Sequence, residues 1–227
     1  MKILVIDNNI DRDSWGAASI VRFAREVSGA TVTVRRAPEQ DLPADPLAFD
    51  RVVVSGSKTT ATDDAPWIEK LSVFMRNLLD AGRPLLGVCY GHQMLARTLG
   101  GKQVVHQAAA PEFGWSRIET IAPSVLMAGL PEVFYSYSSH FDEVIELPPG
   151  TKLLARSEAC SIQAFQAEGR PVFGIQFHPE RNLAEAKQSL AQRKKLGVPK
   201  VLLHPDKSDK LFDPKVGETI FRNFFTL

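Results

Sequence analysis

The sequence has little of several features that would assign it to a specialised class of protein. It contains two cysteines in 227 residues, which is too few for a disulfide scaffold. Its formal net charge is +1, so the charge balance gives no case for binding nucleic acid or a membrane surface. No stretch approaches the roughly 20 apolar residues of a membrane span, and the apolar run at the N-terminus is too short for a signal peptide. These absences predict a cytoplasmic globular protein.

The sequence also lacks the residue spacings that hold inorganic or nucleotide groups. It has neither a cluster of ligands at zinc-site spacing nor a glycine-rich phosphate loop. It has no internal repeat and no low-complexity tract. We therefore expect no metal and no cofactor.

The first half of the chain alternates short apolar runs with amphipathic helical patterns. The expected strands are residues 2–6, 31–34, 51–55 and 85–88, and the expected helices are residues 15–27, 66–81 and 90–99. Such alternation is typical of a parallel sheet with helices on both faces.

The second half changes character, because short candidate strands follow one another with few helices between them. The expected strands are residues 117–121, 133–137, 152–155, 162–166 and 172–177; a helix at 184–196, a loop at 197–215 and a last helix at 217–225 follow. We predict a single α/β domain over residues 1–227, with a central mixed, mostly parallel sheet flanked by helices. A C-terminal insertion at residues 184–215 would be added to this domain.

The sharpest local feature is the segment Gly87-Val88-Cys89-Tyr90-Gly91, which follows an expected strand and opens an expected helix. This G-x-C-x-G pattern matches the nucleophile elbow known for serine, in which flanking glycines relieve the crowding of a tight turn. A helix N-terminus beside the sulfur favours a reactive thiolate. An inert, packed cysteine is the alternative for Cys89, but its setting favours the nucleophile. Cys160 has no such setting and is interpreted as structural.

A thiol nucleophile needs a base, and His178 is the strongest candidate among the five histidines. It comes directly after an expected strand and is followed by Pro179 and Glu180. Side chains at positions i and i+2 of a strand point to the same side. Glu180 would therefore orient the ring of His178, as the third member of a triad does. Taken singly, each residue would be an ordinary polar group, but the elbow cysteine favours the functional interpretation.

Two separate motifs together resemble the class I, or triad, glutamine amidotransferase family. They are Gly87-Val88-Cys89-Tyr90-Gly91-His92-Gln93 and Gln176-Phe177-His178-Pro179-Glu180. They occur in the family's order, about 90 residues apart, which makes the match specific. The segment at residues 6–9 resembles the glutaminase subunits of anthranilate synthase, whereas residues 139–144 look more like GMP synthase. The resemblance implies a flavodoxin-like arrangement over residues 1–182 and the final helix.

The resemblance also implies a role for each residue of the triad and its oxyanion hole. Cys89 would be the nucleophile, His178 the general base and acid, and Glu180 the orienting carboxylate. The backbone N–H of Tyr90 and the loop at Gly56 would form the oxyanion hole.

Further positions match the family's substrate contacts. Gln93 would help to hold the substrate glutamine, and the backbone of Ser139 and His140 would bind its amino-acid end. The family usually has two adjacent glycines and a proline in its oxyanion loop, whereas this loop reads Ser55-Gly56-Ser57-Lys58. Ser57, placed among the substrate-binding residues, alters the oxyanion geometry, indicates a loop that closes only when a partner binds, or is a harmless substitution.

The expected activity is hydrolysis of the glutamine side-chain amide to glutamate and ammonia through a γ-glutamyl thioester. The ammonia would pass to a separate synthase partner, because the chain has no room for a synthase domain. Two alternatives remain open: a stand-alone γ-glutamyl hydrolase or peptidase, and a non-catalytic regulatory homologue. The lysine- and arginine-rich insertion is either a solvated surface or a docking surface for a partner or a second copy of the chain.

Overall fold

The computed structural model describes residues 1–13, 16–197 and 201–227. The elements of the N-terminal half are β1 (Lys2–Asp7), α1 (Gly16–Arg25), β2 (Thr31–Arg36), β3 (Arg51–Val54), α2 (Pro66–Asp80), β4 (Leu85–Val88) and α3 (Tyr90–Gly100). Those of the C-terminal half are β5 (Val105–Thr120), β6 (Val133–Val144), β7 (Thr151–Arg156), β8 (Ala164–Ala167), β9 (Val172–Ile175), α4 (Leu183–Leu196), α5 (Ser208–Leu211) and α6 (Pro214–Phe225). Four 3-10 turns lie between them in the described part of the chain.

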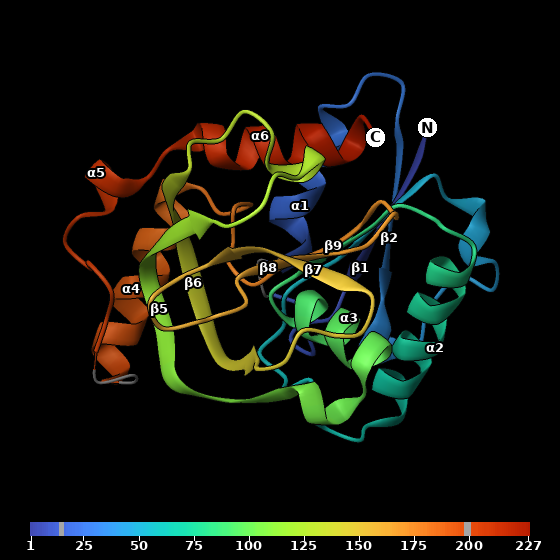
Figure 1. Ribbon diagram of the computed structural model, residues 1–227, viewed down its shortest axis with the longest axis horizontal. Helices are drawn as coiled ribbons and strands as arrows, with labels where there is room; N and C mark the ends of the chain where they lie inside the picture. The colour runs from blue at the N-terminus through green and yellow to red at the C-terminus, as the bar shows by residue number, and fades with distance from the viewer. Residues whose placement is uncertain (14–15, 198–200) are drawn as a thin grey trace.

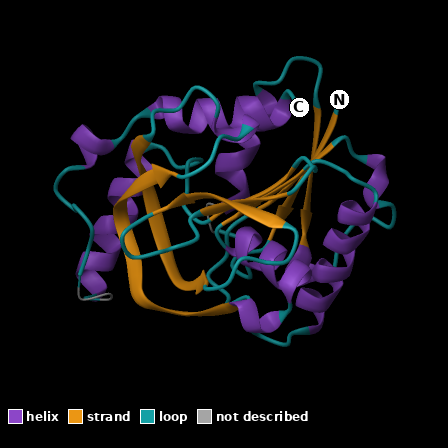
Figure 2. Ribbon diagram, in the orientation of Figure 1, coloured by secondary structure: helices purple, strands orange, loops and turns teal. Residues whose placement is uncertain are grey.

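All of the described strands belong to one mixed sheet, in the order β2-β1-β3-β4-β9-β8-β7-β5-β6 (Figure 1). The ladders from β2 to β9 are parallel. The ladders from β9 to β6 are antiparallel. The long hairpin of β5 and β6 turns away from the plane of the parallel strands (Figure 2). The predicted α/β domain with a mixed sheet flanked by helices is confirmed.

The parallel strands β1, β3, β4 and β9 are buried on both faces, which explains why they read as continuous apolar runs, whereas the edge strand β2 is partly exposed. Ile3 and Val5 of β1 point to a core closed by α1 and α6. Leu4 and Ile6 of the same strand point to a second core closed by α2 and α3. A period of two in side-chain direction thus divides each strand between two helical layers.

Two expectations differ from the structure. β5 and β6 are far longer than the predicted strands at 117–121 and 133–137. The length of β6 was not apparent from the sequence because polar residues such as Ser136 and Ser138 are buried within it. They interrupt the apolar alternation that indicates a strand. The predicted loop at 197–215 is wrong in part, because it contains α5 and the first residues of α6. The predicted helix start at Trp15 lies outside the described residues.

Residues 183–197 and 201–212, here called the C-terminal arm, pack on the outer side of the β5–β6 hairpin. Ala186 and Leu190 of α4 contact Trp115 and Tyr137. Leu203 exchanges two backbone hydrogen bonds with β5, at Phe113 and Trp115. A Cβ at Gly114 would lie 2.1 Å from the carbonyl oxygen of Leu203, so this contact needs glycine. No described helix combines the length and apolar character that crossing a bilayer requires.

Candidate active site

Cys89 stands at the turn between β4 and α3 in a backbone conformation that side chains rarely adopt. Its φ is 51° and its ψ is −103°, which costs free energy unless the surroundings enforce it. Its N–H donates to the carbonyl of Ile175 at 2.8 Å. A Cβ at Gly87 would lie 2.3 Å from the Gly91 oxygen, and one at Gly91 would lie 2.2 Å from the Val54 oxygen. The two glycines therefore provide the space that this turn requires.

His178 and Glu180 lie in the segment after β9, next to Cys89. The Nδ1–H of His178 donates to Oε1 of Glu180 at 2.7 Å. The other side-chain partner of His178 is Cys89. Glu180 is fully buried, and Cys89 and His178 are each 3% exposed. The structure thus brings the three predicted residues into one hydrogen-bonded chain from thiol to imidazole to carboxylate.

The charge state of His178 follows from this arrangement. Burial alone would lower its pKa, but the Glu180 carboxylate and Cys89 outweigh burial and raise the pKa to about 9. The ring is therefore an imidazolium at neutral pH, with its charge compensated by its two partners. Such a group is ready to give up a proton.

Two arginines that the sequence analysis did not single out surround Glu180. Arg22 of α1 donates to the Glu180 carbonyl at 2.7 Å. Arg181 is 5% exposed, and its guanidinium lies 4.9 Å from the ring centre of Tyr137. Burial lowers the pKa of Arg181 to about 10, against the opposing effect of Tyr137 and Glu180. The position of Arg181 directly after Glu180 was the only available sign in the sequence.

The loop at Gly56 and Ser57 lies against the triad. A Cβ at residue 56 would lie 3.0 Å from Cε1 of His178 and 3.5 Å from Cβ of Cys89. A side chain at residue 56 would therefore press against the ring of His178, and neither Gly56 nor Ser57 has a positive φ. The hydroxyl of Ser57 donates to the Asn8 carbonyl at 2.8 Å and accepts from the N–H of Thr59 at 3.1 Å. The Ser57 side chain is thus hydrogen-bonded both to its own loop and to the segment after β1. The backbone of Ser57 is unstrained.

The segment after β1 holds this loop in place. The side-chain amide of Asn8 donates to the Ser55 carbonyl at 2.7 Å. That of Asn9 donates to the Gly56 carbonyl at 3.4 Å and to Asp7 at 2.9 Å. Asp7 in turn pairs with Arg36 of β2 at 2.6 Å. The sequence resemblance at residues 6–9 thus falls on a buried network that supports the Gly56 loop.

β6 forms the opposite wall of the site. The Tyr137 carbonyl accepts the N–H of His178 at 2.7 Å, and the Ser139 carbonyl lies 4.0 Å from Sγ of Cys89. Gln93 donates through Nε2 to the Asp142 carbonyl at 2.7 Å and to Gln176 at 3.1 Å. All three predicted glutamine contacts, at Gln93, Ser139 and His140, therefore lie on or against this wall.

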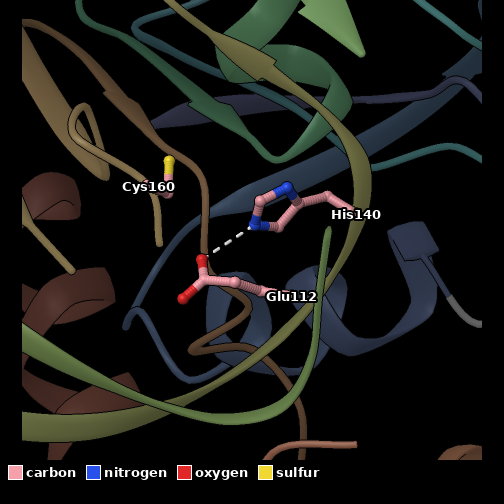
Figure 3. Close-up of side chains that lie close together, drawn as sticks. All are labelled: Glu112, His140 and Cys160. Carbon is pink, nitrogen blue, oxygen red and sulfur yellow. Dashed lines mark hydrogen bonds and ion pairs between the residues drawn. The ribbon is translucent and has the colours of Figure 1, made fainter. Parts of the chain in front are cut away.

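The side chain of His140 is buried and pairs with a residue of β5. Its Nε2 lies 3.0 Å from Oε2 of Glu112, and both side chains are buried. Cys160 lies beside them (Figure 3), so that ligand atoms of the three residues fall within 4.8 Å of one another. No local pattern in the sequence indicates this cluster, because its members are contributed by β5, β6 and the loop before β8.

His92 of α3 is fully buried. Its ring packs 4.9 Å from that of Phe165, and burial lowers its pKa to about 3. A surface cavity of about 580 Å³ lies near Thr120, Lys152 and Gln166, and no triad residue lines it.

Comparisons with known proteins agree with this geometry. A family model described as glutamine amidotransferase class-I matches residues 10–197. A glutamine-hydrolyzing GMP synthase subunit from Methanocaldococcus jannaschii is 36% identical over 178 residues, which cover 78% of this chain and 87% of that protein. The subunit of the same name from Thermococcus kodakarensis is 46% identical over 97 residues, 43% of this chain. The match spans half the length of that relative.

A solved structure shows the same fold along nearly the whole chain. The glutamine amido transferase of Methylobacillus flagellatus superposes with a TM-score of 0.83 at 21% identity, covering 99% of this chain and 94% of that one. At this identity the likeness establishes the fold alone.

The two cysteines should differ sharply in reactivity. Burial, followed by the nearby carboxylates of Glu112 and Glu143, raises the pKa of the Cys160 thiol well above its ordinary value. Cys89 instead lies at a helix N-terminus beside an imidazolium. We expect iodoacetamide to alkylate Cys89 and leave Cys160 unmodified in the native protein, as peptide mass spectrometry would record. Urea-unfolded protein is the control, since both thiols should react there. Equal native labelling of the two would contradict the assignment.

Proposed function

Because the chain belongs to the class-I glutamine amidotransferase family, we propose that it hydrolyses the side-chain amide of glutamine to glutamate and ammonia. The observation that carries this proposal is the hydrogen-bonded chain of Cys89, His178 and Glu180 at the elbow after β4. A thiolate, a protonated imidazole and an orienting carboxylate are the groups that amide cleavage through a covalent intermediate requires.

The first half of the reaction forms a thioester. The sulfur of Cys89 attacks the side-chain amide carbon of glutamine, and the electron pair of the carbonyl moves onto its oxygen. When this pair returns, the C–N bond breaks and the imidazolium of His178 gives its proton to the departing nitrogen. Ammonia leaves, and the γ-glutamyl group stays on Cys89. The pKa of about 9 means that His178 holds this proton at neutral pH.

The second half of the reaction regenerates the enzyme. His178, now neutral, takes a proton from a water molecule, which attacks the thioester carbon. Glutamate leaves, the sulfur is released, and His178 is again an imidazolium. Glu180 stabilises the charged ring throughout and fixes its orientation through the 2.7 Å hydrogen bond to Nδ1.

The oxyanion formed in both halves needs donors already in place. The N–H of Tyr90, at the first position of α3, is one donor in the proposal. The peptide between Gly56 and Ser57 is the other. Its carbonyl points to Asn9 and accepts the Ser55 hydroxyl. The N–H of a trans peptide points opposite to its carbonyl, so the bonds to Asn9 and Ser55 orient this donor.

A separate synthase is the proposed consumer of the ammonia. The relatives from Methanocaldococcus jannaschii and Thermococcus kodakarensis are each named as one subunit of GMP synthase, which supports a second polypeptide that carries the synthase reaction. The C-terminal insertion at 184–215 is proposed as a specialised part of the domain. Turnover of γ-glutamyl peptides is the alternative to turnover of glutamine, and the two are separated by comparing both substrates.

The central test is glutamate release from glutamine by the purified chain beside its Cys89→Ala variant. We expect activity in the parent chain and a loss of at least about a thousandfold in the variant, because the covalent route disappears. A γ-glutamyl dipeptide serves as the second substrate. Turnover of the dipeptide without turnover of glutamine would favour the γ-glutamyl hydrolase alternative. Equal activity in the two proteins would refute the role of Cys89.

The pH profile tests the role of His178. We expect kcat/KM to fall as pH rises through about 9, because His178 then lacks the proton for the leaving nitrogen. Glu180→Gln removes the charge that raises the pKa, so the alkaline limb should move to lower pH. Glu218→Gln, an exposed change on α6, is the control and should leave the profile in place. An alkaline limb that stays at the same pH in the Glu180→Gln variant would contradict this assignment.

Ser57 provides a test of the oxyanion loop. Ser57→Ala deletes the hydrogen bonds to Asn8 and Thr59 and leaves the backbone allowed. Because a single oxyanion donor is typically worth ~100- to 1000-fold in rate, loosening one should lower kcat by about tenfold, with KM little changed. Lys58→Ala, at the adjacent exposed position, is the control. Steady-state kinetics on glutamine would check both variants, and a purely raised KM would instead place Ser57 against the substrate.

A further inference from the structure

A buried group of polar side chains lies directly behind the segment of β6 that faces Cys89. It consists of Glu112, His140, Ser157, Cys160 and Gln163, here called the Glu112 cluster. Nε2 of His140 lies 3.0 Å from Oε2 of Glu112 (Figure 3), and the Ser157 hydroxyl donates to Oε1 at 2.8 Å. The side-chain amide of Gln163 donates to Glu112 as well. The carboxylate thus receives donors on both of its oxygens.

Both ring nitrogens of the histidine at the centre of this cluster face oxygen acceptors. Nε2 of His140 faces Glu112, and Nδ1 lies 3.0 Å from the Asp142 carbonyl. Burial would raise the pKa of Glu112, but His140 and Ser157 outweigh burial and lower it below its ordinary value. A buried carboxylate with several hydrogen-bond donors can remain charged in such a site.

The backbone at this point lacks the regular pairing that would otherwise fix it. Gln107 pairs with Asp142 and Glu112 pairs with His140, so residues 108–111 of β5 lie opposite Phe141 alone. An interruption of this kind leaves ladder groups unpaired and strand position weakly specified. The bonds of His140, to Glu112 in β5 and to Asp142 in its own strand, span this interruption.

The braced segment carries groups of the active site. The Ser139 carbonyl lies 4.0 Å from Sγ of Cys89. The Asp142 carbonyl accepts from Gln93 of α3 at 2.7 Å as well as from His140. A shift of His140 would therefore move the wall opposite Cys89 and the partner of Gln93 together.

The residue types of the cluster also match a metal site, since Glu, His and Cys all bind zinc. The hydrogen bonds argue for a different use. Both oxygens of Glu112 already accept from side chains, and the second ring nitrogen of His140 faces the Asp142 carbonyl. The cluster is therefore organised as a hydrogen-bonded brace.

We infer that Glu112 and His140 are a positioning pair that sets residues 139–142 for binding the glutamyl part of the substrate. The inference rests on the proposed function. The pair acts through the backbone of β6 and touches no reacting atom. Its loss should weaken substrate binding more than it slows the chemistry at Cys89.

Glu112→Gln is the direct test, because it keeps the shape of the side chain and removes its charge. We expect KM for glutamine to rise about ten- to a hundredfold, the range typical of a lost charge-assisted hydrogen bond, with kcat changed less than about threefold. Glu119→Gln is the matched control. It lies on the same strand in a regular part of the ladder, pairs with Arg156 at the surface, and should leave KM unchanged. Ser157→Ala, a milder change in the same cluster, should raise KM by an intermediate factor.

Labelling of Cys89 separates positioning from general damage. A glutamine-like chloroketone must bind before it alkylates, whereas iodoacetamide needs only a reactive thiol. Glu112→Gln should slow the chloroketone at least about fivefold and leave the iodoacetamide rate unchanged. An equal loss with both reagents, no loss with either, or zinc bound stoichiometrically to the parent chain and lost in the variant would each overturn the inference. A parent chain that neither hydrolyses glutamine nor takes the chloroketone overturns the proposed function itself.

Discussion

The geometry of the site depends on the strained backbone of Cys89. A φ of 51° at a residue with a side chain persists only where neighbours enforce it. Here the enforcement comes from three strands: β4 ends at the turn, β9 accepts the Cys89 N–H through Ile175, and β3 approaches Gly91 so closely that a Cβ would meet the Val54 oxygen at 2.2 Å. The strained turn places the sulfur at the carboxyl ends of the parallel strands. The loops that carry the other functional groups begin at these same ends.

The antiparallel half of the sheet provides the wall of the active site that lies opposite Cys89. The β5–β6 hairpin turns away from the parallel strands and returns β6 to the loop after β9, where the Tyr137 carbonyl meets the His178 N–H at 2.7 Å. Four consecutive residues of β5 then connect this wall to the arm. Glu112 points inward to His140, Phe113 lies under the guanidinium of Arg193 at 4.3 Å, Gly114 admits Leu203, and Trp115 donates to Ser208. The arm is therefore linked to the active-site wall through both strands of the hairpin, since Tyr137 of β6 also donates to Ser189 of α4.

Buried charges near the site are each matched by an opposite charge and by further hydrogen bonds. His178 pairs with Glu180, His140 with Glu112, and Asp7 with Arg36. Burial without such partners would cost several kcal/mol for each charge. Each pair joins segments on which the site depends: the loop after β9, the hairpin, and the loops after β1 and β3. Pairing of this kind specifies the relative positions of the joined segments more strictly than apolar contacts do.

The amino-acid sequence alone was enough to identify the family, which the match over residues 10–197 confirms, and the alternation of strands and helices that leads to the elbow. These features are local: a G-x-C-x-G turn and an apolar period can be read within a few residues. The rest depended on the folded chain. The hydrogen bond of Ser57 to Asn8 could be seen only in the structure, and the place of Glu112 beside His140 had no local signal. β6 was foreseen only to residue 137, because its buried polar residues break the apolar pattern. Their partners lie on other strands, and a hydrogen bond between residues far apart in sequence leaves no period along the chain.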